Sequence, residues 1–204
     1  MPNKALFVID VQKDFLTGAL ANPRAVKKLP NIVKKIKEHD GIVIATHDTH
    51  FNELQVKTNW PLDSNAVVYE ESLEGQKIPV PHCIKLSDGW EIEPTVLAAI
   101  EEKNMNGEHH FFAVDKYTFG KKDWEEYLQV FEISEIEICG FVSSICVLAN
   151  AIILRAIFPN KKITVDVNCI EDLDDEGQAA TIKCLKMQQI DEREPNQYGC
   201  NKFE

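Results

Sequence analysis

The stretch from Ile136 to Ala151 constrains the fold and the chemistry of this chain more than any other. It opens with a strand-length apolar run at 136–139, and a tight turn at Gly140 with two serines follows. Cys146 then begins an apolar run that is typical of a buried helix. A helix N-terminus stabilises a thiolate, and its free N–H groups can also bind an oxyanion. The alternative is a small buried cysteine with a packing role only.

Strand-length apolar runs alternate with helix-like segments along the rest of the chain. We expect strands at 5–9, 42–46, 111–114, 136–139 and 163–167, and helices at 25–39, 94–100, 123–131, after Cys146 and at 177–187. This alternation predicts an α/β fold: a doubly wound, three-layer domain with a mainly parallel sheet, spanning residues 1–204 as one unit.

The remaining segments are expected to lack regular structure. Residues 10–15 are predicted to be a loop, and 191–204 a polar tail that is frayed or packed against a partner. The stretch 51–89 is predicted to be irregular, and a loop of that length inside a compact domain usually has a function.

Charge and composition exclude several classes of partner. The net charge is −11, from 22 basic and 33 acidic residues, which argues against nucleic acid and anionic membranes as partners. We see no apolar run of membrane-spanning length and no signal-like segment before the first strand, so we expect a cytoplasmic protein. The six cysteines are then expected to be reduced.

Reactive side chains follow the predicted strands at the same end. Asp10 follows the first strand, Asp48 and His50 the second, Lys116 the third and Cys146 the fourth. In doubly wound folds ligands bind beyond the carboxyl ends of the strands, so these residues are expected to share a site.

Among these residues, the cysteine, the lysine and the first aspartate suit nucleophilic catalysis on a carbonyl group. Cys146 would attack, and the positive charge of Lys116 would lower the pKa of the thiol. Asp10 would take the thiol proton and return it to the leaving group. Backbone N–H groups near Val142 and Cys146 would hold the oxyanion. A plain salt bridge between Asp10 and Lys116 is the alternative.

A second group of residues could bind a metal ion. Asp48 and His50 face the same way on extended backbone, and His82 lies in a proline-rich stretch. One aspartate and two histidines form a recognised ligand set for a divalent transition metal. The alternative is that both histidines are ordinary loop residues. His47 would point the other way.

Together, five segments resemble the isochorismatase-like cysteine hydrolases, and within them the metal-containing nicotinamidases. They stand in the family's order and cover most of the chain: 10–15, 47–50, 81–91, 115–120 and 140–147.

The resemblance implies a role for each matching residue. The catalytic residues would be Asp10, Lys116 and Cys146. Val142, which would follow a cis peptide bond, would help to hold the oxyanion, and the ring of Phe15 would stack on the substrate. The metal ligands would be Asp48, His50 and His82. The expected reaction converts nicotinamide to nicotinate and ammonia through a thioester. The expected ion is zinc, with iron or manganese as alternatives, and a homo-oligomer is expected.

The chain also departs from the family's pattern. Ser144 stands where the family usually has aspartate, Leu86 where a glycine is common, and 56–69 has the character of an insertion beside the site. Two other hypotheses therefore remain: a cysteine hydrolase for another small amide or an N-carbamoyl compound, and a catalytically idle binding subunit.

Overall fold

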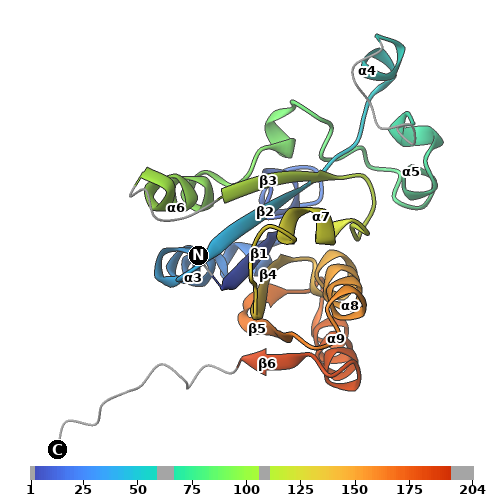
Figure 1. Cartoon of the computed structure of the whole chain (residues 1–204). Coiled ribbons are helices and arrows are strands. Elements are labelled where there is room, and N and C mark those ends of the chain that lie inside the picture. Colours follow the sequence, from blue (N-terminus) through green and yellow to red (C-terminus); the bar gives the residue numbers. More distant parts are fainter. Residues whose placement is uncertain (1–2, 59–66, 106–110, 194–204) are drawn as a thin grey trace, which may run out of the picture.

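A computed structural model describes residues 3–58, 67–105 and 111–193 of the chain. In this part of the chain, six strands form one parallel sheet in the order β3-β2-β1-β4-β5-β6 (Figure 1). The strands are β1 (Lys4–Ile9), β2 (Ile42–Asp48), β3 (Phe111–Lys116), β4 (Glu135–Phe141), β5 (Lys162–Glu171) and β6 (Asp191–Arg193). The winding direction reverses between β1 and β4, which is the switch point where doubly wound folds bind ligands.

Helices cover both faces of the sheet, which confirms the predicted α/β fold. Helices α3 and α6 lie on one face, and α7, α8 and α9 lie on the other (Figure 1). The helices are α1 (Lys13–Leu16), α2 (Pro23–Val26), α3 (Leu29–Glu38), α4 (Glu53–Lys57), α5 (Leu73–Lys77), α6 (Pro94–Met105), α7 (Trp124–Leu128), α8 (Leu148–Ile157) and α9 (Asp175–Met187). None of the described helices is long and apolar enough to cross a bilayer.

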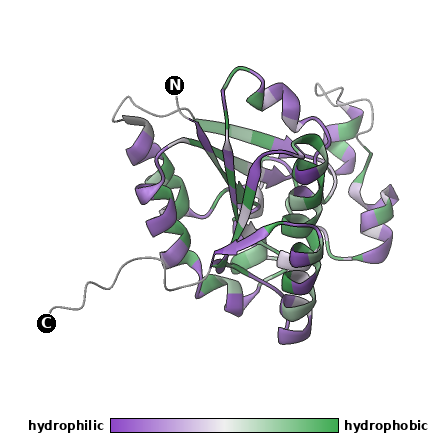
Figure 2. Ribbon diagram, turned by 60° about the horizontal axis from the view of Figure 1, so that its bottom comes forward, coloured by the Kyte–Doolittle hydropathy of each residue, from purple (hydrophilic) through white to green (hydrophobic). Residues whose placement is uncertain are grey.

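The sheet is buried on both faces, and this explains its continuous apolar runs. Along β1, Phe7 and Ile9 join the core cluster under α7, α8 and α9, while Leu6 and Val8 join the cluster under α3 and α6. Figure 2 shows the same arrangement: hydrophobic residues line the strands and the inner faces of the helices, and hydrophilic residues face outward.

Several predicted boundaries were wrong for local reasons. The helix expected at 25–39 is two helices, α2 and α3, and Pro30 lies in the first turn of the second. Proline lacks a backbone N–H group, so it is tolerated there but not inside one long helix. The predicted loop at 10–15 contains α1.

Two segments expected to be irregular also contain regular structure. The stretch 51–89 holds α4, α5 and two 3₁₀ turns, Tyr69–Glu71 and Asp88–Trp90. Within the polar tail, Asp191–Arg193 pairs with β5 as a short edge strand, whose polar side chains suit a partly solvated edge. Most of the proposed 56–69 insertion and the tail beyond 193 lie outside the described residues.

Candidate active site

The residues expected at the carboxyl ends of the strands do lie together there. Asp10 directly follows β1, Asp48 and Lys116 end β2 and β3, and Cys146 lies just after β4. The register of the parallel strands pairs Asp48 with Lys116, so these two residues are neighbours across the sheet. All four side chains are buried.

Lys116 is at the centre of the site. Its Nζ lies 2.7 Å from Asp10 Oδ2, 3.0 Å from Asp48 Oδ1 and 3.7 Å from Cys146 Sγ. The ammonium group thus contacts the predicted nucleophile, the predicted base and one predicted metal ligand at once. The Asp10–Lys116 pair is therefore part of a larger buried network and not the isolated rim salt bridge considered as an alternative.

Electrostatics set the resting protonation of these groups. Burial disfavours the Lys116 cation, but the charges of Asp10 and Asp48 outweigh burial and hold its pKa well above the ordinary value. Burial raises the pKa of the Cys146 thiol well above its ordinary value, with Asp10 and Asp48 adding to the rise. Lys116 acts on this pKa in the predicted, lowering direction, but it does not outweigh burial. The resting thiol is therefore neutral, and it would need a base in order to act as a nucleophile.

Asp10 is suited to act as that base. Burial raises its pKa above the ordinary value, Asp48 raises it further and Lys116 opposes the rise. The residue has a positive φ of 48°, a conformation that aspartate tolerates better than most residues. Thr46 fixes its orientation, because Asp10 N–H donates to Thr46 Oγ1 (2.9 Å) and that hydroxyl donates to Asp10 Oδ1 (2.6 Å).

Cys146 sits in a π-helical turn, Ser143–Val147, that leads directly into α8. The N–H groups of Ile145 and Val147 both donate to the Val142 carbonyl and close the turn (3.1 and 3.2 Å). The peptide bond between Phe141 and Val142 is cis, as the resemblance implied. Behind the turn, the Asn150 side chain donates to the Cys146 carbonyl (2.8 Å).

The approach to this turn requires a glycine. Gly140 has a φ of 119°, and a Cβ atom there would lie 2.0 Å from the Ile9 carbonyl oxygen on the neighbouring strand. Only glycine allows β1 and β4 to approach so closely just before the turn. The strand, the tight turn and the thiol at the beginning of a helix are all found where the sequence predicted them.

The three predicted metal ligands converge beside the predicted catalytic residues. Asp48 Oδ2 lies 3.0 Å from His50 Nε2 and 3.6 Å from His82 Nε2. His47 lies apart from this cluster, as expected, and stacks on the Trp90 ring.

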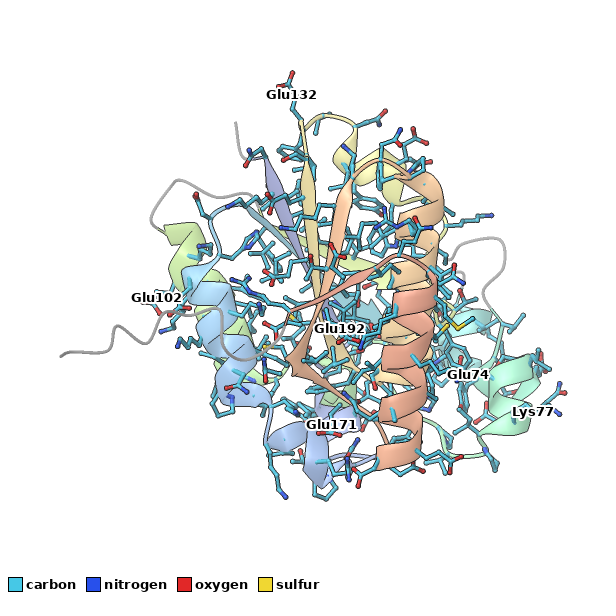
Figure 3. The ribbon with its side chains drawn as sticks, turned by 90° about the horizontal axis from the view of Figure 1, so that it is seen from below. Glu74, Lys77, Glu102, Glu132, Glu171 and Glu192 are labelled. Carbon is cyan, nitrogen blue, oxygen red and sulfur yellow. The ribbon has the colours of Figure 1, made fainter. Side chains whose placement is uncertain are left out.

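A fourth candidate ligand, Glu74, was missed by the sequence reasoning. Its Oε1 lies 3.6 Å from His50 Nε2 and 3.4 Å from His82 Nε2. Figure 3 shows Glu74 on the side of α5 that faces the body of the protein, while Lys77 points away from it. No ligand spacing in the sequence marks Glu74, because it stands in the first turn of a short helix, where acidic residues are common anyway.

The donor set fits a divalent transition metal. One ligand atom from each of Asp48, His50, Glu74 and His82 lies within 4.8 Å of all the others. Two imidazoles and two carboxylates are ligands that zinc, iron and manganese accept. These four residues would hold such an ion, and two negative charges would offset those of the ion.

Neighbouring groups orient the ligands, as in many metal sites. His82 Nδ1 donates to the Val80 carbonyl (2.9 Å), which leaves Nε2 directed at the cluster. Gln12 holds the backbone of Asp48, since its amide oxygen accepts from Asp48 N–H (2.8 Å) and its amide nitrogen donates to Asp48 C=O (2.9 Å). Asp14 accepts from the N–H of Cys83 (2.7 Å), the residue next to His82.

Phe15, the predicted substrate-stacking residue, borders the same cluster. Its ring meets His82 edge to face, with 5.6 Å between ring centroids, and the side chain is 8% exposed. The ring therefore lies beside the candidate metal ligands, where a flat substrate could contact it.

The protonation of the two histidines predicts how a metal ion would bind. Burial lowers their pKa values, but Asp48 and Glu74 outweigh it and raise the pKa of His50 to about 9 and that of His82 to about 10. Without metal both imidazoles are thus protonated at pH 7. Because a metal ion needs neutral imidazole, binding one ion at pH 7 should release about two protons. Calorimetry of zinc binding in buffers of different ionisation enthalpy measures this number.

His50→Gln provides the control for the proton count. The variant lacks one of the two protonated rings, so it should release about one proton fewer per ion. Zinc binding to the unaltered protein without any proton release would contradict the assignment.

Comparison with known proteins identifies the family. The family model of the isochorismatase domain matches residues 4–192. Among solved structures, a nicotinamidase/pyrazinamidase from Bacillus subtilis is 21% identical with a TM-score of 0.70, covering 94% of this chain and 100% of that one. The yeast nicotinamidase is 20% identical with a TM-score of 0.70, covering 93% and 98%.

A pyrazinamidase of Pyrococcus horikoshii, solved in complex with zinc, is 20% identical with a TM-score of 0.64 and covers 95% of this chain and 99% of that one. No curated protein matches the sequence. At these identities the solved structures establish a shared fold. The family model spans nearly the whole chain, and the protein therefore belongs to the isochorismatase family.

Proposed function

We propose that this protein is a cysteine amidohydrolase that converts nicotinamide to nicotinate and ammonia. One observation carries the proposal: Lys116 Nζ contacts Cys146, Asp10 and Asp48, so that a buried nucleophile, its base and a four-residue metal set form one connected site. Solved structures that share this fold are named as nicotinamidases.

The first half of the reaction forms a thioester. Cys146 Sγ attacks the carboxamide carbon while its proton passes to Asp10, and Lys116 stabilises the negative charge that develops on sulfur. The N–H groups of Val142 and Cys146 hold the oxyanion. Asp10 then returns the proton to the leaving nitrogen, the C–N bond breaks and ammonia departs.

The second half hydrolyses the thioester. Asp10 removes a proton from a water molecule, whose oxygen attacks the thioester carbon. The C–S bond breaks, Cys146 is regenerated as a thiol with the proton from Asp10, and the carboxylic acid leaves. The raised pKa of Asp10 suits a group that accepts and returns a proton in each half-reaction.

The remaining residues would select the substrate. A divalent ion, with zinc as the first expectation and iron or manganese as alternatives, would be held by Asp48, His50, Glu74 and His82 and would supply a coordination position for a ring nitrogen. Phe15 would pack on the ring of the substrate.

A comparison of substrates tests the proposal. Ammonia release from nicotinamide is measured beside benzamide, which lacks the ring nitrogen, and beside an N-carbamoyl amino acid, with as-isolated, metal-stripped and metal-restored protein. We expect nicotinamide to be preferred over benzamide by about 100-fold, because benzamide has no ring nitrogen to occupy the coordination position of the metal ion. Metal removal should abolish this preference.

Two results would overturn parts of the proposal. Equal turnover of nicotinamide and benzamide, with or without metal, would exclude recognition through the ring nitrogen. Turnover of the N-carbamoyl compound alone would favour the second hypothesis, a hydrolase of the metal-independent kind.

A further inference from the structure

A buried carboxylate from another strand holds the turn that carries the nucleophile. Asp172 directly follows β5 and is 3% exposed. Its Oδ2 accepts hydrogen bonds from Ser143 Oγ and from the backbone N–H of Ser144, both at 2.7 Å. Its Oδ1 accepts from the N–H of Leu173 (2.8 Å). Asp172 thus contacts the two residues that begin the turn, three and two positions before Cys146.

Proton counting assigns the direction of these bonds. Ser143 Oγ lies 2.7 Å from two acceptors, Asp172 Oδ2 and Gln178 Oε1 on α9. A hydroxyl group has one proton, and the carboxylate is the stronger acceptor. Ser143 therefore donates its proton to Asp172, and Gln178 Oε1 is the weaker, competing acceptor.

The surroundings keep Asp172 ionised and leave room for it. Burial opposes its ionisation, but the hydrogen bonds from Ser143, Ser144 and Leu173 outweigh burial and hold the pKa of the carboxyl below its ordinary value. On α9, a Cβ atom at Gly177 would lie 2.4 Å from Asp172 Oδ1. A glycine at that position therefore lets the helix pass over the carboxylate.

The beginning of the turn has no side-chain cap from its own N-cap residue. The side chain of Val142, the residue before the turn, makes no capping hydrogen bond. The carboxylate of Asp172 takes the place of such a cap. At the other side, Asn150 donates to the carbonyl of Cys146. The nucleophile thus lies between two anchors, one before and one behind it.

We propose that Asp172, acting through Ser143 and Ser144, is a positioning residue that holds the Cys146 turn and its N–H groups in the geometry that attack and oxyanion binding require. The N–H of Ser144 is committed to Asp172, so it does not serve the oxyanion, and the peptide plane behind it is fixed. The catalytic part of this inference rests on the proposed amidohydrolase function.

The variant Asp172→Asn tests the inference, because it keeps the shape of the side chain but removes the charge. We expect kcat for nicotinamide to fall about 10- to 100-fold with KM changed less than about threefold, since a small displacement of the oxyanion donors acts on the transition state. Glu171→Gln is the matched control. Glu171 is the preceding residue. Its side chain pairs with Arg24 and Lys28 and accepts from the backbone N–H of Asp172 (3.3 Å), a bond that a glutamine oxygen can keep, so kcat should not change. Figure 3 labels Glu171, well apart from Glu74.

A second measurement does not depend on the substrate. Alkylation by iodoacetamide is followed by mass spectrometry at Cys146 and at Cys139, which are 5% and 0% exposed in the same protein. A loosened turn should speed alkylation of Cys146 about threefold or more in Asp172→Asn while Cys139 stays protected. General destabilisation would instead expose both cysteines, and that result would overturn the inference.

Ser143→Ala covers the case in which Asp172→Asn does not fold. It removes only the hydroxyl group and should speed Cys146 alkylation in the same way. Wild-type kcat and wild-type alkylation in these variants would overturn the positioning role. If no protein in the series, wild type included, hydrolyses nicotinamide, the proposed function fails, and the alkylation rates alone decide the role of Asp172.

Discussion

Cys146→Ala is expected to reduce ammonia release from nicotinamide by about 10,000-fold or more, because removal of a nucleophile leaves no group that can form the covalent intermediate. Little loss of stability should accompany this change. The variant loses the contacts of the thiol with Asp10 and Lys116, but Lys116 keeps its ion pairs with Asp10 and Asp48. The measurement is a steady-state assay of ammonia, with thermal unfolding recorded on the same samples.

Cys184→Ala provides the matched control for the loss of a thiol. Cys184 is a partly exposed free cysteine on α9, outside the candidate site. Its replacement should leave turnover unchanged. Substantial hydrolysis by Cys146→Ala would contradict covalent catalysis and would move attention to direct attack by water.

Lys116→Met is expected to have the largest effect on stability. The substitution removes a cation that is 1% exposed and leaves the carboxylates of Asp10 and Asp48 buried without it. Breaking a buried pair in this way costs about 3–5 kcal/mol of unfolding free energy. Urea denaturation at pH 8 measures this loss, and turnover should disappear as well.

The pH dependence of the stability loss distinguishes the loss of a buried ion pair from a simple packing defect. The pKa of Asp10 is already above its ordinary value, and it rises further without Lys116, so the folded variant holds a proton on Asp10 that the unfolded chain does not. Its stability therefore increases as pH falls, and the deficit relative to wild type should be smaller at pH 5 than at pH 8. A deficit that does not change with pH would contradict the electrostatic explanation.

Lys37→Met is the control for loss of a lysine. Lys37 pairs with Glu102 at 2.6 Å, but the two side chains are 50% and 62% exposed. Such solvated pairs contribute about 0–1 kcal/mol, so the variant should unfold close to wild type.

Local patterns were sufficient for the fold. Continuous apolar runs such as 5–9 and 42–46 can only be buried on both faces, and that favours a parallel sheet covered by helices on both sides. The patterns failed where one residue or one hydrogen-bonding edge decided the outcome: Pro30 divided a predicted helix, and Asp191–Arg193 became a strand by pairing with the free edge of β5.

The candidate catalytic residues were also visible in the sequence, because residues that follow parallel strands meet at one edge of the sheet. The sequence alone therefore predicts that Asp10, Asp48, Lys116 and Cys146 lie near one another. The single domain, the cytoplasmic location and the homo-oligomer remain predictions.

Only the tertiary structure decided the features that depend on contacts distant in sequence. Glu74 became a candidate ligand because α5 brings it to His50 and His82, and Asp172 reached the nucleophile turn from the end of β5. The resting state of Cys146 is a further case. Lys116 alone would favour a thiolate, but burial in the assembled site outweighs its charge and keeps the thiol neutral. Sequence spacing reports which side chains are available near a strand end, whereas desolvation and cross-strand contacts arise only when the whole chain is packed.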